Sequence, residues 1–131
     1  MSETAAELAG RVVGTDFEGW PDWLRAEFQA NAYNFQIGQR LLSETDRVKV
    51  WQIRLAPGER VPAHRHVLDY FWTAVTPGRG EQHVDDGTTR EVSYYAGETR
   101  HLVFPAERYL LHDLRNTGTE PLIFVTVEHK R

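Results

Sequence analysis

The chain has 131 residues, a formal net charge of −4 and no cysteine. That length fits one domain, and the lack of cysteine excludes disulfides, thiol nucleophiles, thiolate metal sites and iron–sulfur clusters. The acidic balance argues against a nucleic-acid partner, because phosphate binding needs a basic face.

Two further absences concern membranes and targeting. No apolar run approaches the roughly 18 residues that a membrane span needs. The first ten residues lack the basic start and the apolar stretch of a secretory signal. We therefore expect a cytoplasmic protein with no membrane partner.

Residues 1–39 are predicted to form an N-terminal arm that packs on the rest of the chain or at a dimer interface. Four large apolar residues of the arm recur at helical spacing: Trp20, Trp23, Leu24 and Phe28. Pro21 suits the first turn of a helix, where its missing N–H costs nothing. An apolar stripe of this kind usually faces a core, so we expect a short helix packed on the main core.

Residues 40–131 are predicted to be all-β. Short runs of β-branched and aromatic residues alternate there with Gly, Pro and Asp. The expected strands are Arg40–Leu42, Val48–Leu55, Arg60–His64, Tyr70–Val75, Gly80–Val84, Arg90–Tyr94, Thr99–Phe104, Tyr109–Asn116 and Leu122–Glu128. Asp85-Asp86-Gly87 is typical of a hairpin turn. Many short strands with no helical period between them indicate a sandwich or barrel.

Histidines are the candidate metal ligands. His64 and His66 are two apart on an expected strand, so both side chains leave the same face. Thr99–Asn116 can be interpreted as a hairpin that places His101 opposite His112, with Cβ atoms about 5 Å apart. Two pairs of imidazoles on strand faces suit zinc, iron, copper or nickel. His83 and His129 are expected at the surface.

The chain resembles the cupin superfamily from about Arg40 to Glu128. The first cupin motif is matched by Gly58, His64 and His66, preceded by Leu55-Ala56-Pro57. The second is matched by Gly97, Pro105, His112 and Asn116, followed by the turn Thr117-Gly118-Thr119-Glu120-Pro121. The resemblance implies a single-domain jelly-roll barrel with a metal site.

One motif position differs from the cupin pattern. Where the first motif has a metal-binding Glu, this chain has Tyr70. The hairpin argument supplies His101 as a replacement, so the expected ligands are His64, His66, His101 and His112. Tyr70 is the rival fourth ligand, and if only three histidines bind the metal it is a hydrogen-bond donor behind them instead. In a catalytic role, Tyr70 or a metal-bound water would move protons. We expect one divalent metal per chain, zinc before iron.

The residues expected to share the histidine face make a mostly apolar substrate pocket. They are Leu68, Trp72, Thr99, Val103, Leu110 and Leu114. Such walls suit a flat or aromatic organic substrate, although a packing role in the barrel core is nearly as good an interpretation for Trp72.

Among cupins, the small size, the missing Glu and the many histidines are most similar to the zinc-dependent polyketide cyclases of the resistomycin and tetracenomycin type. This resemblance implies aldol-type cyclisation and dehydration of a poly-β-ketone, with Lewis-acid stabilisation of an enolate. The alternatives are an iron-dependent cupin dioxygenase, a non-enzymatic small-molecule-binding cupin and an inert barrel. Because an exposed sheet edge needs covering, we also expect a homodimer.

Overall fold

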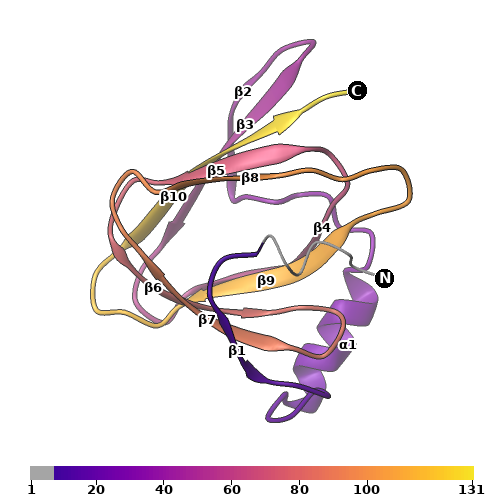
Figure 1. The fold of residues 1–131 in the computed structure, drawn as a ribbon, viewed down its shortest axis with the longest axis vertical. Helices are drawn as coiled ribbons and strands as arrows, with labels where there is room; N and C mark the ends of the chain where they lie inside the picture. Colours follow the sequence, from indigo (N-terminus) through magenta and orange to yellow (C-terminus); the bar gives the residue numbers. More distant parts are fainter. Residues whose placement is uncertain (1–7) are drawn as a thin grey trace.

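Two five-stranded antiparallel sheets face each other in this computed structural model, which describes residues 8–131 (Figure 1). One sheet, here called the β4–β9 sheet, has the order β1-β7-β6-β9-β4. Its strands are β1 (Arg11–Gly14), β7 (Thr89–Tyr94), β6 (Gly78–His83), β9 (Leu110–Asn116) and β4 (Arg60–His66). This sheet carries the histidine motifs His64-x-His66 and His112.

The other sheet, here called the β5–β10 sheet, has the order β2-β3-β10-β5-β8. Its strands are β2 (Arg40–Glu44), β3 (Val48–Leu55), β10 (Leu122–His129), β5 (Tyr70–Ala74) and β8 (Thr99–Leu102). The all-β prediction is confirmed, and each expected strand has a counterpart. β1 was not expected, because a short strand with three exposed residues at a sheet edge carries little apolar pattern.

The expected hairpin of Thr99–Asn116 is wrong. β8 pairs with β5, and Phe71 lies opposite His101. β9 pairs instead with β4 and β6 in the facing sheet. The connection 103–109 therefore crosses from one sheet to the other, which separates His101 from His112.

Helix α1 (Asp22–Ala30) covers the outer face of the β4–β9 sheet. Trp20, Leu24 and Phe28 are buried there against Ala63 and Leu111, as the apolar stripe predicted. Trp23 departs from that prediction with 58% exposure. No helix among residues 8–131 is long and apolar enough to cross a membrane.

The space between the sheets holds the main core. Alternate residues of the facing strands fill it, among them Ile53, Leu55, Val61, Leu122 and Phe124. Alternation places every second side chain of a strand inside, and β10 follows this rule from Leu122 to Glu128. The site described next lies on the same inner faces.

Candidate metal centre

Three histidines converge between the sheets. β4 supplies His64 and His66, and β9 supplies His112 from the position opposite His64. One ring nitrogen from each lies within 4.8 Å of the other two. All three side chains are buried, at 2%, 2% and 9% exposure. This spacing lets one ion contact all three, since imidazole nitrogens bind zinc at about 2.0–2.1 Å.

A β-bulge in β4 sets the direction of the first two histidines. Val61 pairs with Leu114, and the next recorded pair is His64 with His112, so β4 contains one residue more than β9 in this interval. The extra residue shifts the alternation. Ala63 consequently packs under α1 on the outer face, while Val61 and His64 both face inward.

Hydrogen bonds fix how two of the rings present their nitrogens. His64 Nδ1 donates to the Pro62 carbonyl at 2.8 Å, and His112 Nδ1 donates to Gln82 Oε1 at 2.7 Å. Since a carbonyl can only accept, each Nδ1 carries the proton and each Nε2 keeps its lone pair. Partners of this kind orient metal-binding histidines in proteins. His66 Nδ1 is buried and has no hydrogen-bond partner among the described residues.

Burial keeps these imidazoles neutral. Desolvation lowers the pKa of His66 well below its usual range, and the neighbouring His64 and His112 lower this pKa further. Burial and then His64 lower the pKa of His112 in the same way. Burial also lowers the pKa of His64, against an opposing effect from the Pro62 carbonyl and Asp113. Neutral imidazole is the form that binds metals, so the donor set fits a divalent ion.

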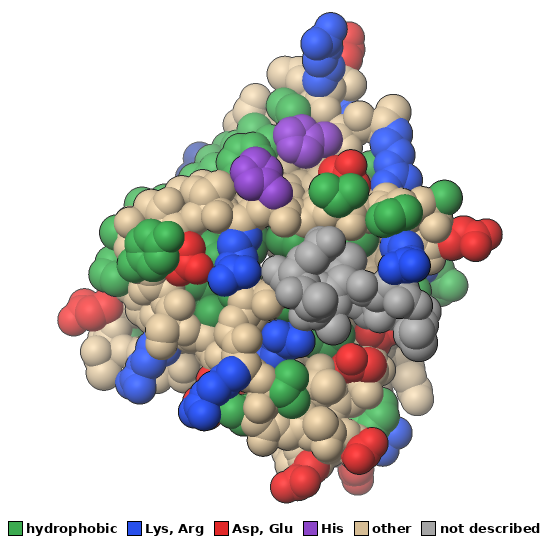
Figure 2. Space-filling view, in the orientation of Figure 1, with side chains coloured by type: hydrophobic (Ala, Val, Ile, Leu, Met, Phe, Trp, Pro, Cys, Tyr) green, Lys and Arg blue, Asp and Glu red, His purple; other side chains and the backbone are tan. Residues whose placement is uncertain are grey.

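His101 does not join this group. It is exposed on the outer face of the β5–β10 sheet, with its ring 5.2 Å from that of Phe71. Figure 2 shows histidine side chains at the surface in the part of the view where Figure 1 places β5 and β8. The expectation that His101 is a fourth metal ligand is thus wrong, because its placement beside His112 depended on a hairpin between β8 and β9.

Tyr70 lies beside the histidines. Its ring stacks on His66 with centroids 4.0 Å apart and planes 9° from parallel. The Phe104 ring is also parallel to the Tyr70 ring, with centroids 5.9 Å apart, and Tyr70 is 3% exposed. The residue that replaces the motif Glu is therefore held rigidly at the edge of the three-histidine group.

A small cavity with a volume of about 50 Å³ opens onto these residues. The lining residues are Ile37, Ile53, His64, His66, Tyr70, Trp72, Gln82, Tyr94, His112, Leu114, Phe124 and Thr126. Aromatic rings pack edge-on within the wall, with Trp72, Tyr94 and Phe124 at centroid distances of 4.9–5.5 Å. The cavity is thus mostly apolar, with the polar groups gathered near the histidines.

Only part of the predicted pocket lines this cavity. Trp72 and Leu114 do. Leu110 is fully buried in an adjacent cluster with Tyr70 and Phe104, and Leu68 lies half-buried between β4 and β5. Thr99 and Val103 were placed inside by the hairpin argument and are exposed instead. β8 turns Leu102 inward beside Tyr70, which sends its odd-numbered neighbours outward.

Several site residues were missed from the sequence. Gln82 Oε1 accepts a hydrogen bond from His112 Nδ1, and the Gln82 side chain also hydrogen-bonds Tyr94. Its alternation with Val84 on the expected strand Gly80–Val84 was a usable signal for an inward polar side chain. Thr126 alternates in the same way with Phe124 on β10. Ile37 precedes the expected barrel, and no pattern marked it.

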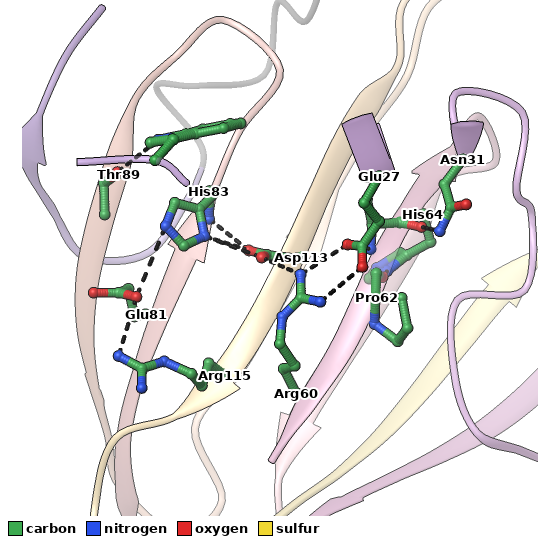
Figure 3. Close-up of polar contacts among 12 residues, drawn as sticks. Glu27, Asn31, Arg60, Pro62, His64, Glu81, His83, Thr89, Asp113 and Arg115 are labelled. Carbon is green, nitrogen blue, oxygen red and sulfur yellow. Dashed lines mark hydrogen bonds and ion pairs between the residues drawn. The ribbon is translucent and has the colours of Figure 1, made fainter. Parts of the chain in front are cut away.

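A charged network lies directly behind the site, on the outer face of the β4–β9 sheet (Figure 3). Arg60 binds both oxygens of Glu27 at 2.8 Å and Asp113 Oδ2 at 2.7 Å. Asp113 is fully buried and also accepts from the backbone N–H of His83 at 2.7 Å. His83 Nδ1 lies 3.0 Å from Asp113 Oδ2, so this histidine belongs to the network and not to the metal group.

Comparison with known proteins identifies the fold. No protein-family model and no curated protein matches the chain. Among solved structures, a cupin domain from Bordetella pertussis Tohama I superposes with a TM-score of 0.63 at 23% identity, over 70% of this chain and 91% of that one. The chain has the cupin fold.

Two further cupin-like structures agree. An RmlC-like cupin from Methanocaldococcus jannaschii gives a TM-score of 0.55 at 20% identity, over 69% of this chain and 76% of that one. A protein with a double-stranded β-helix domain from Klebsiella pneumoniae gives a TM-score of 0.54 at 27% identity, over 68% of this chain and 72% of that one. The three-histidine group could hold a metal ion.

Proposed function

We propose that this cupin is a zinc-dependent cyclase that closes a ring in a poly-β-ketone or aromatic polyketide intermediate by aldol-type cyclisation and dehydration. The observation that carries the proposal is the convergence of His64, His66 and His112, buried and neutral, on one apolar cavity. No carboxylate belongs to this group within residues 8–131.

The donor set suits Lewis-acid chemistry. Three neutral ligands leave a divalent ion its full charge, and three protein ligands on zinc leave a position for substrate. When bound, the ion polarises a substrate carbonyl and acidifies the protons next to it. His64 and His112 are held for this purpose by the Pro62 carbonyl and by Gln82.

The cavity wall supports a small apolar or aromatic substrate. Trp72, Tyr94 and Phe124 present ring edges and faces to the space in front of the histidines. Apolar walls of this kind exclude water and restrict a flexible chain to a few folded shapes. Thr126 and Gln82 are the polar lining groups that could orient substrate oxygens.

Tyr70 is proposed to move the proton. Its stacking on His66 holds the phenol at the edge of the metal group, and a positioned acid–base group contributes about 10²–10⁴-fold to a rate. Tyr70→Phe keeps the stacked ring and removes the hydroxyl. We expect turnover to fall while zinc affinity is unchanged. A parallel loss of zinc affinity would instead make Tyr70 the fourth ligand.

The homodimer remains part of the proposal. β2 is an edge strand whose residues are all exposed, with Leu41 at 42% and Leu42 at 44%. Tyr33 and Phe35, just before it in the chain, are also exposed. An uncovered apolar edge favours pairing with a second copy. Light scattering at micromolar concentration should give the mass of a dimer, and a monomer mass would refute it.

Metal analysis followed by assays tests the function. Protein purified without added metal should contain zinc and convert a synthetic poly-β-ketone to a cyclised, dehydrated product, which mass spectrometry detects as loss of water. Bound iron with oxygen consumption would replace the proposal by a dioxygenase. Binding of aromatic ligands without turnover would replace it by a non-enzymatic binding cupin.

A further inference from the structure

One peptide group joins a helix carboxylate to one of the clustered imidazoles. The N–H of the Pro62–Ala63 peptide donates to Glu27 Oε2 at 3.0 Å. The carbonyl oxygen of the same peptide accepts from His64 Nδ1 at 2.8 Å. Figure 3 shows Glu27 on α1, with Pro62 and His64 on β4 beside it. The carboxylate and the imidazole therefore contact opposite ends of one planar dipole.

The β-bulge explains why a helix side chain reaches this peptide. Pro62 and Ala63 lie between the paired residues Val61 and His64 where β9 has only Asp113, and neither has a recorded partner in the ladder. Glu27 accepts the Ala63 N–H, while Asn31 Nδ2 and Asn34 Nδ2 donate to the Ala63 carbonyl at 3.1 and 3.0 Å. Since buried backbone groups need partners, α1 and the residues after it complete the bulge that orients His64.

Hydrogen bonds in such a chain strengthen one another. A carboxylate on the N–H increases the negative charge on the carbonyl oxygen, which then accepts more strongly from the imidazole. An imidazole that donates its Nδ1 proton to a strong acceptor is a more basic ligand at Nε2. His112 offers a comparison within the same site, because its Nδ1 donates to the neutral amide of Gln82.

We propose that Glu27 is a positioning residue for the metal centre, which holds the His64 ring and strengthens His64 Nε2 as a ligand through the Pro62–Ala63 peptide. The proposal rests on the proposed function, because it requires His64 to bind a metal. Arg60 fixes the Glu27 carboxylate by binding both of its oxygens. Arg60 also binds Asp113, so this group of two carboxylates and one guanidinium keeps a net negative charge behind His64.

The test compares Glu27→Gln with Asp22→Asn. Gln keeps an oxygen that can accept the Ala63 N–H and removes the charge. Asp22 is an exposed residue of the same helix, so Asp22→Asn removes one negative charge away from the peptide. Co²⁺ affinity is measured by chelator competition, with the visible spectrum of the bound ion as the readout. We expect Glu27→Gln to bind Co²⁺ about 10–100-fold more weakly and Asp22→Asn to bind like the wild type.

A second readout separates this role from a general structural one. In NMR spectra of the metal-free variants, the His64 Nδ1 proton should move upfield in Glu27→Gln, while the His112 Nδ1 proton should not. A folded Glu27→Gln protein with wild-type Co²⁺ affinity overturns the inference and leaves the proposed function standing. A wild-type protein that binds no Co²⁺ overturns the proposed function, and this inference falls with it.

If Glu27→Gln does not fold, the inference is tested on the wild-type protein instead. The scalar coupling across the hydrogen bond between His64 Nδ1 and the Pro62 carbonyl carbon should increase when Zn²⁺ saturates the site. An absent or unchanged coupling overturns the inference.

Discussion

His112 and Asp113 are neighbours on β9, and their side chains lie in opposite environments. His112 faces the cavity beside two other neutral imidazoles. Asp113 faces α1 and binds Arg60 and His83. The inner face of the β4–β9 sheet is thus mostly apolar and neutral around the histidines, while the outer face is ionic and paired around Asp113.

The difference shows how one sheet can hold a reactive site in place. Neutral imidazoles repel one another little and keep lone pairs for an ion, but they contribute few hydrogen bonds to the fold. The ionic groups on the outer face connect α1, β4, β6 and β9 through named hydrogen bonds. The outer face therefore contributes mainly to stability, and it reaches the metal site through the Pro62–Ala63 peptide that Glu27 and His64 both contact.

The largest expected effect on stability comes from the outer face. Arg60→Met leaves the fully buried Asp113 without its cation, and breaking a buried ion pair costs about 3–5 kcal/mol. Urea unfolding measures the loss. The matched control is Arg115→Ala, whose ion pair with Glu81 is half-exposed and should contribute below about 1 kcal/mol. Equal losses of unfolding free energy in both variants would contradict a special contribution of the buried Arg60–Asp113 pair.

A pH effect is expected from the inner face. The pKa values of His64, His66 and His112 are lowered in the folded state, so the unfolded chain takes up protons first as pH falls below about 6.5. Stability of the metal-free protein should therefore be complete above that pH and fall by about 2–3 kcal/mol between pH 6.5 and 5.

Urea unfolding across this pH range measures the effect. The double variant His66→Gln/His112→Gln should give a flatter profile, and the exposed control His129→Gln should follow the wild type. A double variant with the wild-type slope would show that the buried imidazoles are not the source.

The smallest expected effect concerns a carboxylate on the facing sheet. Burial raises the pKa of Glu128, against an opposing hydrogen bond from Trp51 Nε1 at 2.7 Å. A carboxyl with a raised folded pKa loses stability as pH rises through that pKa. Glu128→Gln should thus gain stability relative to the wild type, by under about 1 kcal/mol, between pH 4 and pH 7. A relative loss over that range would contradict this.

Local patterns in the sequence were enough to predict most of the strands and part of the candidate site. Alternation and turn residues located the strands after residue 39, and the His64-x-His66 spacing correctly put both rings on one face. The motif match also brought His112 to the same site. These predictions succeeded because strand alternation and turn geometry depend on neighbouring residues.

The errors arose where partners are distant in the chain. His101 was paired with His112 by assuming that consecutive strands form a hairpin, whereas β8 and β9 lie in different sheets. The same assumption misplaced Thr99 and Val103. Glu27 and Gln82 act on His64 and His112 across 37 and 30 positions of sequence. Strand alternation could have marked Gln82 as an inward polar residue, but no local pattern reveals its partner His112 or the bulge that Glu27 contacts.

Zinc binding by the wild type and two variants tests the central claim most directly. Titration calorimetry on the wild type, His112→Ala and His101→Ala compares a buried member of the cluster with the exposed histidine of β8. The account predicts about one zinc per chain for the wild type and His101→Ala, and affinity at least about 100-fold weaker for His112→Ala. Equal weakening in both variants, or full affinity in His112→Ala, would contradict a metal centre built from His64, His66 and His112.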